Sequence, residues 1–485
     1  MGLLGRALDR YRAMADAQRA KTDPGDAVDL APGLADLLDS DSPVARRDAA
    51  EGLSRIAEEY PDAVADHVDA LAARIPDQEP TVQYFAETPV SYVQTHVAVA
   101  ISRTATERPR AVEPAVSECA DLLGHADPGA RHNAAVVLAE LAREAPETVH
   151  PAADSLAAAL RDDDANIRRA AARAFGHLLR EDPGDALAYR DPLVAALDDP
   201  EAAVREEAAE AIGRLSETDP DAAVDLADAL VDALDDESGE VRGSAARALG
   251  RIARVDVDAV ADATDALAAT LTDEVRDAGR GAGSAVERIA QEDADALGTV
   301  RDLDPLFAAL DAEYLIARRG ASVALVALAE SDPTVGEGRV DALVAALDDE
   351  SQAVRFNATR VLTELGTTDP DALVPRVDAF AALLDDEDPG VRACGAEALG
   401  VVGETRPDAV RGEVDALAGL LGDSDAGARG HAARALGRIG DERALDALRA
   451  RRGGESNDRV QTLLDEAVET IEAGPDATFD PPERS

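Results

Sequence analysis

The chain has 485 residues, of which 46% are hydrophobic but only 2% are aromatic, and it contains no tryptophan. Its core must therefore be built from Ala, Leu, Val and Ile, which suits closely packed helices. The two cysteines, Cys119 and Cys394, are too few and too far apart for a disulfide framework or a metal site. No stretch approaches the ~20 apolar residues of a membrane span, and no secretory segment opens the chain, so we expect a cytoplasmic protein.

Residues 1–22 begin the chain with a helical pattern. Leu4, Leu8, Tyr11 and Met14 fall on one side, beside several basic residues. We expect residues 1–27 to cover the first structural unit that follows. A helix that docks on a membrane surface or on a partner is the alternative.

One phrase then recurs along the chain: ALDDESGEVR at 233–242, ALDDESQAVR at 346–355 and LLDDEDPGVR at 383–392. When the copies are aligned on the apolar residue before the acidic turn, eight of the ten spacings are 37 residues and the others are 48 and 39. A fixed period in this range is the signature of a solenoid. The aligned residues, which we call anchors, are Leu38, Ile75, Leu123, Leu160, Leu197, Leu234, Leu271, Leu310, Leu347, Leu384 and Leu421.

Each period contains two helical patterns. Apolar residues from Ala227 to the anchor Leu234 follow the spacing i, i+3, i+4, i+7, and those from Val241 to Ile252 follow a second helical spacing. The pattern predicts an all-α solenoid of about 11–12 helical hairpins over residues 28–473, followed by a disordered tail at 474–485. A capping residue before Pro predicts where several second helices start: Ser42-Pro43, Asp127-Pro128, Asp199-Pro200 and Asp388-Pro389.

Small residues recur in the second helix of the hairpin. Ala246 and Gly250 lie beside the apolar stripe, and glycine within a helix costs about 1 kcal/mol relative to alanine. The recurrence therefore predicts that neighbouring second helices approach closely. The equivalent pairs are Ala172/Gly176, Ala209/Gly213, Ala396/Gly400 and Ala433/Gly437. The stretch GRGAGSA at 279–285 falls inside a second helix, and we interpret it as a degenerate repeat.

The turn Asp and the Arg six residues after it resemble the HEAT-repeat family, in particular the HEAT-like repeats of phycobilisome lyases. The resemblance covers residues 28–473 and implies that such pairs form a ladder between adjacent repeats. The matching pairs are Asp162/Arg168, Asp199/Arg205, Asp236/Arg242, Asp349/Arg355, Asp386/Arg392 and Asp423/Arg429. The net charge of −51, with Lys21 as the sole lysine, is similar to that of proteins from halophilic archaea, which implies concentrated potassium salt as the solvent condition.

An insertion of about eleven residues interrupts the turn of the second hairpin, within residues 76–92. It holds Tyr84, Phe85 and Tyr92, three of only 12 aromatic residues. Aromatic side chains on a protruding loop are typical anchors for a partner, so we assign these three to partner binding. The alternative is that they fold back over the gap that the insertion creates.

Arginine gathers on one face of the second helices, at positions 9, 13 and 17 after the anchor. Over ten hairpins these positions hold 13 arginines and six glutamates, a net charge of +7 in a chain of −51. The HEAT resemblance places this face on the concave, binding side. We expect it to contact a protein with an acidic surface, and neutralisation of helix C-termini is the alternative. The arginines assigned to the partner are Arg169, Arg173, Arg247, Arg251, Arg280, Arg288 and Arg319.

No catalytic motif is recognisable. None of the seven histidines precedes a glutamate, as the iron-binding histidines of deoxyhypusine hydroxylases do in a related repeat fold. Phosphate-binding loops, dinucleotide fingerprints and nucleophile elbows are also missing from the sequence. We therefore expect a non-catalytic scaffold or adaptor without cofactor or metal. The alternatives are a nucleic-acid-associated protein and, less favoured, an enzyme of the bilin-lyase or hydroxylase type.

Overall fold

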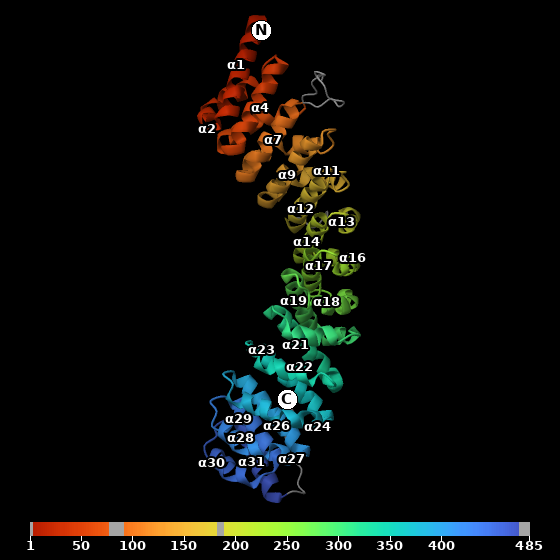
Figure 1. Ribbon diagram of the computed structural model, residues 1–485, viewed down its shortest axis with the longest axis vertical. Helices are drawn as coiled ribbons and strands as arrows, with labels where there is room; N and C mark the ends of the chain where they lie inside the picture. Colours follow the sequence, from red (N-terminus) through yellow and green to blue (C-terminus); the bar gives the residue numbers. More distant parts are fainter. Residues whose placement is uncertain (1–2, 77–91, 182–188, 475–485) are drawn as a thin grey trace. The chain divides into compact units, whose positions relative to one another are not determined.

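The computed structural model describes residues 3–76, 92–181 and 189–474, and all regular structure within these ranges is helical (Figure 1). The chain divides into two compact units, Met1–Ala233 and Leu234–Ser485. In each unit, long helices alternate along the chain with short ones, as the 37-residue period predicts. The prediction of an all-α solenoid of helical hairpins is confirmed.

In the first unit, each long second helix packs against the next one along the chain and against the short helix that precedes it (Figure 1). The long helices are α4 (Pro43–Glu59), α7 (Tyr92–Glu107), α9 (Pro128–Glu144), α12 (Ala165–Glu181) and α14 (Ala202–Thr218). The short helices before them are α3 (Ala31–Leu37), α6 (Val68–Ala72), α8 (Val116–Leu122), α11 (Ala153–Ala159) and α13 (Arg190–Leu197). Single-turn helices precede or follow these: α2 (Pro24–Ala27), α5 (Asp62–Ala65), α10 (Pro146–Val149), α15 (Pro220–Val224) and α16 (Ala227–Asp232).

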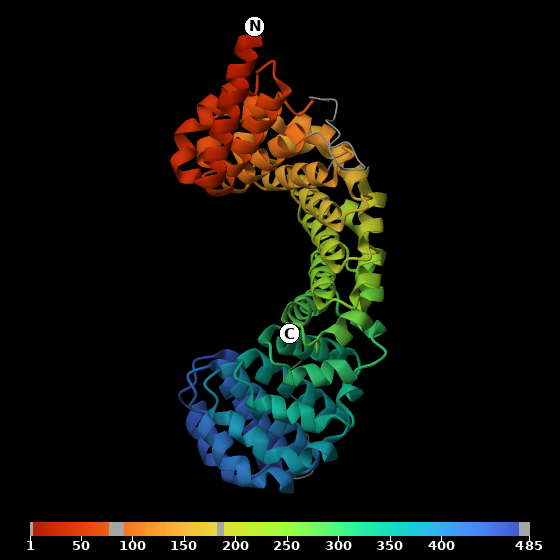
Figure 2. The same cartoon turned by 45° about the horizontal axis from the view of Figure 1, so that its top comes forward.

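The second unit repeats this arrangement, and its long helices again pack side by side in chain order (Figure 2). The long helices are α17 (Gly239–Ile252), α19 (Arg276–Glu292), α21 (Leu315–Ser331), α23 (Gln352–Thr368), α26 (Pro389–Thr405), α29 (Ala426–Ile439) and α31 (Asp458–Ala473). The short helices are α18 (Thr264–Thr270), α20 (Asp304–Ala308), α22 (Val340–Ala345), α24 (Pro370–Leu373), α25 (Val377–Ala382), α27 (Pro407–Val410), α28 (Val414–Leu420) and α30 (Leu445–Arg452).

The core follows the predicted periodicity. Val241, Ala248 and Ile252 on α17 are completely buried, as are Leu230 before the turn and Phe380 on α25. Small aliphatic side chains fill most of this core, so the helices can lie close together without large aromatic residues between them.

Three of the four predicted helix starts are correct. Ser42, Asp127 and Asp388 cap α4, α9 and α26 through side-chain oxygens, with Pro as the first helical residue. The start at Asp199-Pro200 was predicted wrongly, because α14 begins at Ala202. Asp199 lies two residues earlier in the repeat than the true caps, and its carboxylate instead accepts hydrogen bonds from Arg168 and from the N–H of Glu201.

Glycines permit the close packing of the second helices. A Cβ added at Gly250 would lie 2.9 Å from the Cα of Ala285, and one at Gly400 would lie 2.9 Å from the Cα of Ala435. Contacts below 3.0 Å are not tolerated between a Cβ and backbone, so these positions require glycine. In α19, a Cβ at Gly283 would lie 2.4 Å from the carbonyl oxygen of Ile316. The GRGAGSA stretch therefore lies inside a second helix and forms a tight helix–helix contact.

The N-terminal helix α1 (Leu3–Thr22) packs on α4 through small residues rather than through the large apolar residues that its sequence pattern groups on one side. Ala13, Ala17 and Ala20 are buried, whereas Leu8, Tyr11 and Met14 are 62%, 69% and 51% exposed. A Cβ added at Gly52 of α4 would lie 3.2 Å from the Cα of Ala17. Only small side chains therefore fit between the two helices. The large apolar side chains consequently point away from α4.

Candidate partner-binding surface

The ladder arginines connect consecutive hairpins through the turns. The Arg355 guanidinium donates from Nε and Nη2 to the Asp386 carboxylate of the next hairpin, at 2.8 and 2.9 Å. Its Nη1 donates to the carbonyl oxygen of Asp349 in its own turn, at 2.8 Å. Arg355 therefore joins the backbone of its own turn to the carboxylate of the following turn.

Several predicted ladder residues adopt this geometry. Arg168 reaches Asp199 at 2.6 Å and Arg392 reaches Asp423 at 2.7 Å. Arg205 donates to the carbonyl oxygen of Asp199 in its own turn, and the Asp236 carbonyl accepts from Arg242 in the same way. Besides the last rung of the ladder, which is described below, three rungs include residues outside the predicted set, namely Arg131–Asp162, Arg242–Asp273 and Arg318–Asp349.

Sequence reasoning could have found these three rungs from the repeat frame. Arg131 and Arg318 occupy position 8 after their anchors, as every predicted ladder arginine does. The hairpin whose anchor is Leu271 departs from this pattern, because Gly279 occupies position 8 in place of arginine. The next turn has Ala312 in place of the aspartate. In place of this rung, the backbones of α19 and α21 lie close together at Gly283 and Gly320. A Cβ added at Gly320 would lie 2.4 Å from the carbonyl oxygen of Gly283.

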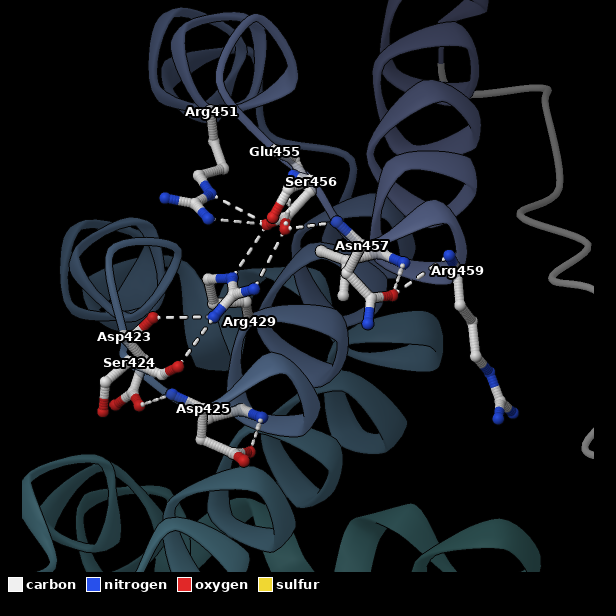
Figure 3. Close-up of polar contacts among 11 residues, drawn as sticks. Asp423, Ser424, Asp425, Arg429, Arg451, Glu455, Ser456, Asn457 and Arg459 are labelled. Carbon is white, nitrogen blue, oxygen red and sulfur yellow. Dashed lines mark hydrogen bonds and ion pairs between the residues drawn. The ribbon is translucent and has the colours of Figure 1, made fainter.

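The last rung ends on a glutamate (Figure 3). Arg429 donates to both Glu455 oxygens at 2.8 and 2.9 Å, and Arg451 donates to Oε2 from Nε and Nη2. The N–H groups of Ser456 and Asn457 also donate to Oε1, at 2.9 Å each. The Glu455 side chain is fully buried. The hydrogen bonds from these donors, of which those from Arg429 have the largest effect, hold the pKa of Glu455 far below its ordinary value.

The electrostatics of the ladder favour the ionised form of the turn aspartates. Burial alone would raise the pKa of Asp386, but the hydrogen bonds from Arg355 and from the N–H of Asp388 lower it below its ordinary value. The pKa of Asp423 is lowered chiefly by its hydrogen bond from Arg392. These carboxylates therefore remain charged and paired at neutral pH.

A second set of ion pairs bridges the short-helix side of the repeats, and it was not predicted. Arg376 and Arg339 contact Asp341 and Asp304, which occupy the same position in consecutive repeats, and Arg406 contacts Asp371 at 2.7 Å from another position. Each pair spans 35 residues, close to one period. All six side chains are at least 36% exposed, so each pair adds little to stability.

Three of the seven predicted binding arginines are ion-paired between adjacent second helices. Arg173 on α12 contacts Glu140 on α9 at 2.9 Å, and Arg319 on α21 contacts Glu287 on α19 at 2.6 Å. Arg169 lies 3.4 Å from Glu207 on α14. The acidic partners Glu207 and Glu287 occupy positions 10 and 16 after their anchors, outside the three positions that gave a charge of +7. These contacts brace neighbouring helices and reduce the free positive charge of the face.

The other four predicted arginines lie on α17 and α19. Arg280 is exposed, and its side chain has no ion pair within the described residues. Arg288 is 39% exposed and lies 3.8 Å from Glu292. Arg247 is half-buried and donates to Ser244 at 2.9 Å, and Arg251 is also half-buried. Arg280 and Arg288 are thus the predicted residues whose charge is most available to a partner.

The insertion assigned to partner binding lies almost entirely outside the described residues. Tyr84 and Phe85 lie outside the described residues, and Tyr92 begins α7 with a side chain that is also outside them. The predicted tail likewise falls outside, apart from Gly474.

The described part of the chain offers no group of three or more His, Cys, Asp or Glu side chains that could hold a metal ion. Both cysteines are buried and reduced, and burial raises the pKa of the Cys119 thiol to about 12. Within the same residues, none of the helices has the length and apolar character needed to cross a bilayer.

The fold and its ladder define an all-α solenoid of helical repeats. The model for HEAT repeats matches residues 152–232, 190–287, 340–412 and 377–469, which together cover more than half of the chain. The chain therefore belongs to the HEAT-repeat family, whose solenoids are typical of scaffold and protein-binding proteins. No curated protein matches it in sequence.

Solved structures agree with this fold. The crystal structure of an engineered protein is similar at 24% identity and a TM-score of 0.53, over 85% of this chain and 99% of that one. A structure from a study of how a conserved phosphorylation switch controls the interaction between cadherin and beta-catenin is similar at 16% identity and a TM-score of 0.59. That match covers 90% of this chain and all of the other. At these identities the likeness concerns the fold.

Proposed function

We propose that this protein is a non-catalytic scaffold or adaptor that binds a protein with an acidic surface through its second-helix face. The observation that carries the proposal is the distribution of charge. Arg280 and Arg288 project from α19 with no strong ion pair, whereas the chain as a whole has a net charge of −51. Accessible arginines on such a chain favour acidic partners by local attraction.

The ion pairs narrow the binding set of the proposal. Three of the predicted arginines form ion pairs with glutamates on neighbouring helices, namely Arg169, Arg173 and Arg319. We therefore propose that their main role is to hold adjacent helices together and that they contribute less to partner binding. Arg247 and Arg251, on the adjacent α17, extend the patch around Arg280. The solved structure connected with cadherin and beta-catenin supports a protein-binding role by analogy of fold alone.

We further propose that the protein works in the cytoplasm in concentrated potassium salt. The support is its acidic, lysine-poor composition. Association with nucleic acid is the second candidate, because the same arginines could contact phosphates. An enzyme of the bilin-lyase or hydroxylase type is the least favoured, since the described residues lack a set of side chains suited to a metal.

The test compares two double variants that remove equal charge. Arg280→Gln/Arg288→Gln changes the second-helix face, and Arg254→Gln/Arg301→Gln changes two exposed arginines elsewhere in the same unit. Each tagged protein is used to purify partners from native extract at high salt, with and without nuclease, and the bound proteins are quantified by mass spectrometry.

We expect one set of proteins to be retained by the wild type and by the Arg254/Arg301 variant and lost by the Arg280/Arg288 variant. The purified partner should then associate more slowly with the Arg280/Arg288 variant. If nuclease removes the bound set, the nucleic-acid function replaces this one. If both variants retain every partner, the second-helix face around α19 does not bind.

A further inference from the structure

A pocket of about 450 Å³ opens between α29 and α31 in the second unit. Val460 and Leu463 form an apolar wall, and Arg434, Arg459 and His431 contribute polar groups. This volume falls within the range of roughly 300–1,000 Å³ that is usual for ligand pockets. The pocket lies on the second-helix face, at the positions that hold the arginines in other hairpins.

The pocket exists because one side chain is missing. Position 9 after the anchor carries a large residue in several hairpins, such as Arg280, Arg319 and Phe356, but here it is Gly430. A Cβ at Gly430 would lie 3.3 Å from Cδ1 of Leu463, so α31 sits close against α29 at this point. Glycine at this position therefore permits the close approach of α31, and no side chain at position 9 of α29 fills the pocket that Gly430 lines.

One positive side chain that lines the pocket has no ion-pair partner within the described residues. Glu397, which reaches the pocket from α26, is engaged by His431 at 3.4 Å and by Arg434 at 3.9 Å. Arg459 is exposed, and its guanidinium has no hydrogen bond or ion pair within the described residues. Figure 3 shows its side chain extending away from the buried Glu455 carboxylate.

Two helix N-termini border the pocket, and both are already capped by side chains of the chain itself. The Asp425 carboxylate accepts from the N–H of Ala428 at the start of α29, and Asn457 Oδ1 accepts from the N–H groups of Arg459 and Val460 at the start of α31. The pocket thus offers a ligand an available guanidinium beside an apolar wall.

We propose that this pocket binds a carboxylate side chain from an extended segment of a partner protein, with a neighbouring apolar side chain against Val460 and Leu463. The carboxylate contacts the Arg459 guanidinium, and the apolar side chain packs against the aliphatic wall. This inference rests on the proposed scaffold function and names the chemistry of one of its contacts.

The probe is a fluorescein-labelled peptide, acetyl-Leu-Glu-Glu-Leu-amide, and its matched control is acetyl-Leu-Gln-Gln-Leu-amide. Binding to the full-length protein is measured by fluorescence anisotropy at two potassium chloride concentrations. We expect the Glu peptide to bind about tenfold more tightly than the Gln peptide, because charge-assisted hydrogen bonds to a guanidinium are lost in the latter.

Two variants test the site. Arg459→Gln removes the available charge without breaking a contact of the described fold, and should weaken binding of the Glu peptide about tenfold. Ala426→Leu narrows the pocket from its rim and should weaken both peptides. Arg254→Gln, the matched control at an exposed arginine in the turn after α17, should leave both affinities within about twofold.

Equal affinity for the two peptides, or an unchanged affinity in Arg459→Gln, would overturn the proposal. Absence of Glu-peptide binding would also overturn it, as would binding of a single-stranded oligonucleotide that Arg459→Gln abolishes. The scaffold function is judged separately, because partners that depend on Arg280 and Arg288 would still be retained if only the pocket assignment were wrong.

Discussion

The two sets of inter-repeat ion pairs should differ greatly in their effect on stability. Replacing Arg355 by Gln removes two hydrogen bonds to Asp386 and leaves that carboxylate with its side chain only 10% exposed. Truncating one partner of a buried pair costs about 3–5 kcal/mol. Residual hydration and the remaining N–H donor of Asp388 reduce this, so we expect a loss of about 3 kcal/mol.

The matched control is Arg376→Gln on the short-helix side. Arg376 and Asp341 are also paired across one repeat, but their side chains are 38% and 85% exposed. Surface pairs of this kind contribute roughly 0–1 kcal/mol, and we expect a loss below about 0.5 kcal/mol.

The assay is urea denaturation at fixed potassium chloride, followed by far-ultraviolet circular dichroism. Repeat arrays can unfold in stages, so the Arg355–Asp386 interaction is isolated with a double-mutant cycle that includes Asp386→Asn. We expect a coupling energy above about 1 kcal/mol. Equal losses for Arg355→Gln and Arg376→Gln would show that burial does not set the strength of these pairs, and would refute the reasoning.

Three further outcomes are expected. Gly250→Ala should lower the melting temperature, because the added Cβ would lie 2.9 Å from the Cα of Ala285. Gly419 in α28 has open space around it, so Gly419→Ala should raise the free energy of unfolding by about 0.5–1 kcal/mol. Burial, aided by four nearby arginines, lowers the pKa of His177 to about 4. The folded protein should therefore lose stability as pH falls from about 6.5 toward 4, and His177→Gln should flatten that slope in melting curves. Helicity should increase between about 0.05 and 3 M potassium chloride as the carboxylates are screened, and a flat signal would contradict the halophilic assignment.

Local periodicity was sufficient to predict the helices. The spacing from Val241 to Ile252 identifies a buried stripe, because each of its positions is determined by one helix facing one core. The cap at Asp199 failed because the same residue type serves two roles two positions apart in the repeat. Only the position of Arg168 on the preceding hairpin shows which role Asp199 takes.

The surface was harder to predict, because it depends on the distance between helices. The stripe of Leu8, Tyr11 and Met14 has the spacing of a packing face, yet the close approach of α1 to α4 selects the alanines instead. Counting charge on single helices likewise missed Glu287, which neutralises Arg319 from the neighbouring helix. Such pairs become visible only when the stacking of two repeats is known.

The form of the ladder also bears on how such a chain can grow during evolution. Each segment that keeps the ladder positions, unlike the one anchored at Leu271, brings an aspartate that accepts from the segment before it and an arginine that donates to the segment after it. Tandem duplication or loss of such a segment therefore leaves the new junctions chemically matched. The terminus is different, because Arg429 meets Glu455 and depends on a second arginine, Arg451, to complete the cluster. New segments can consequently be gained in the interior, whereas the closing unit has to be retained.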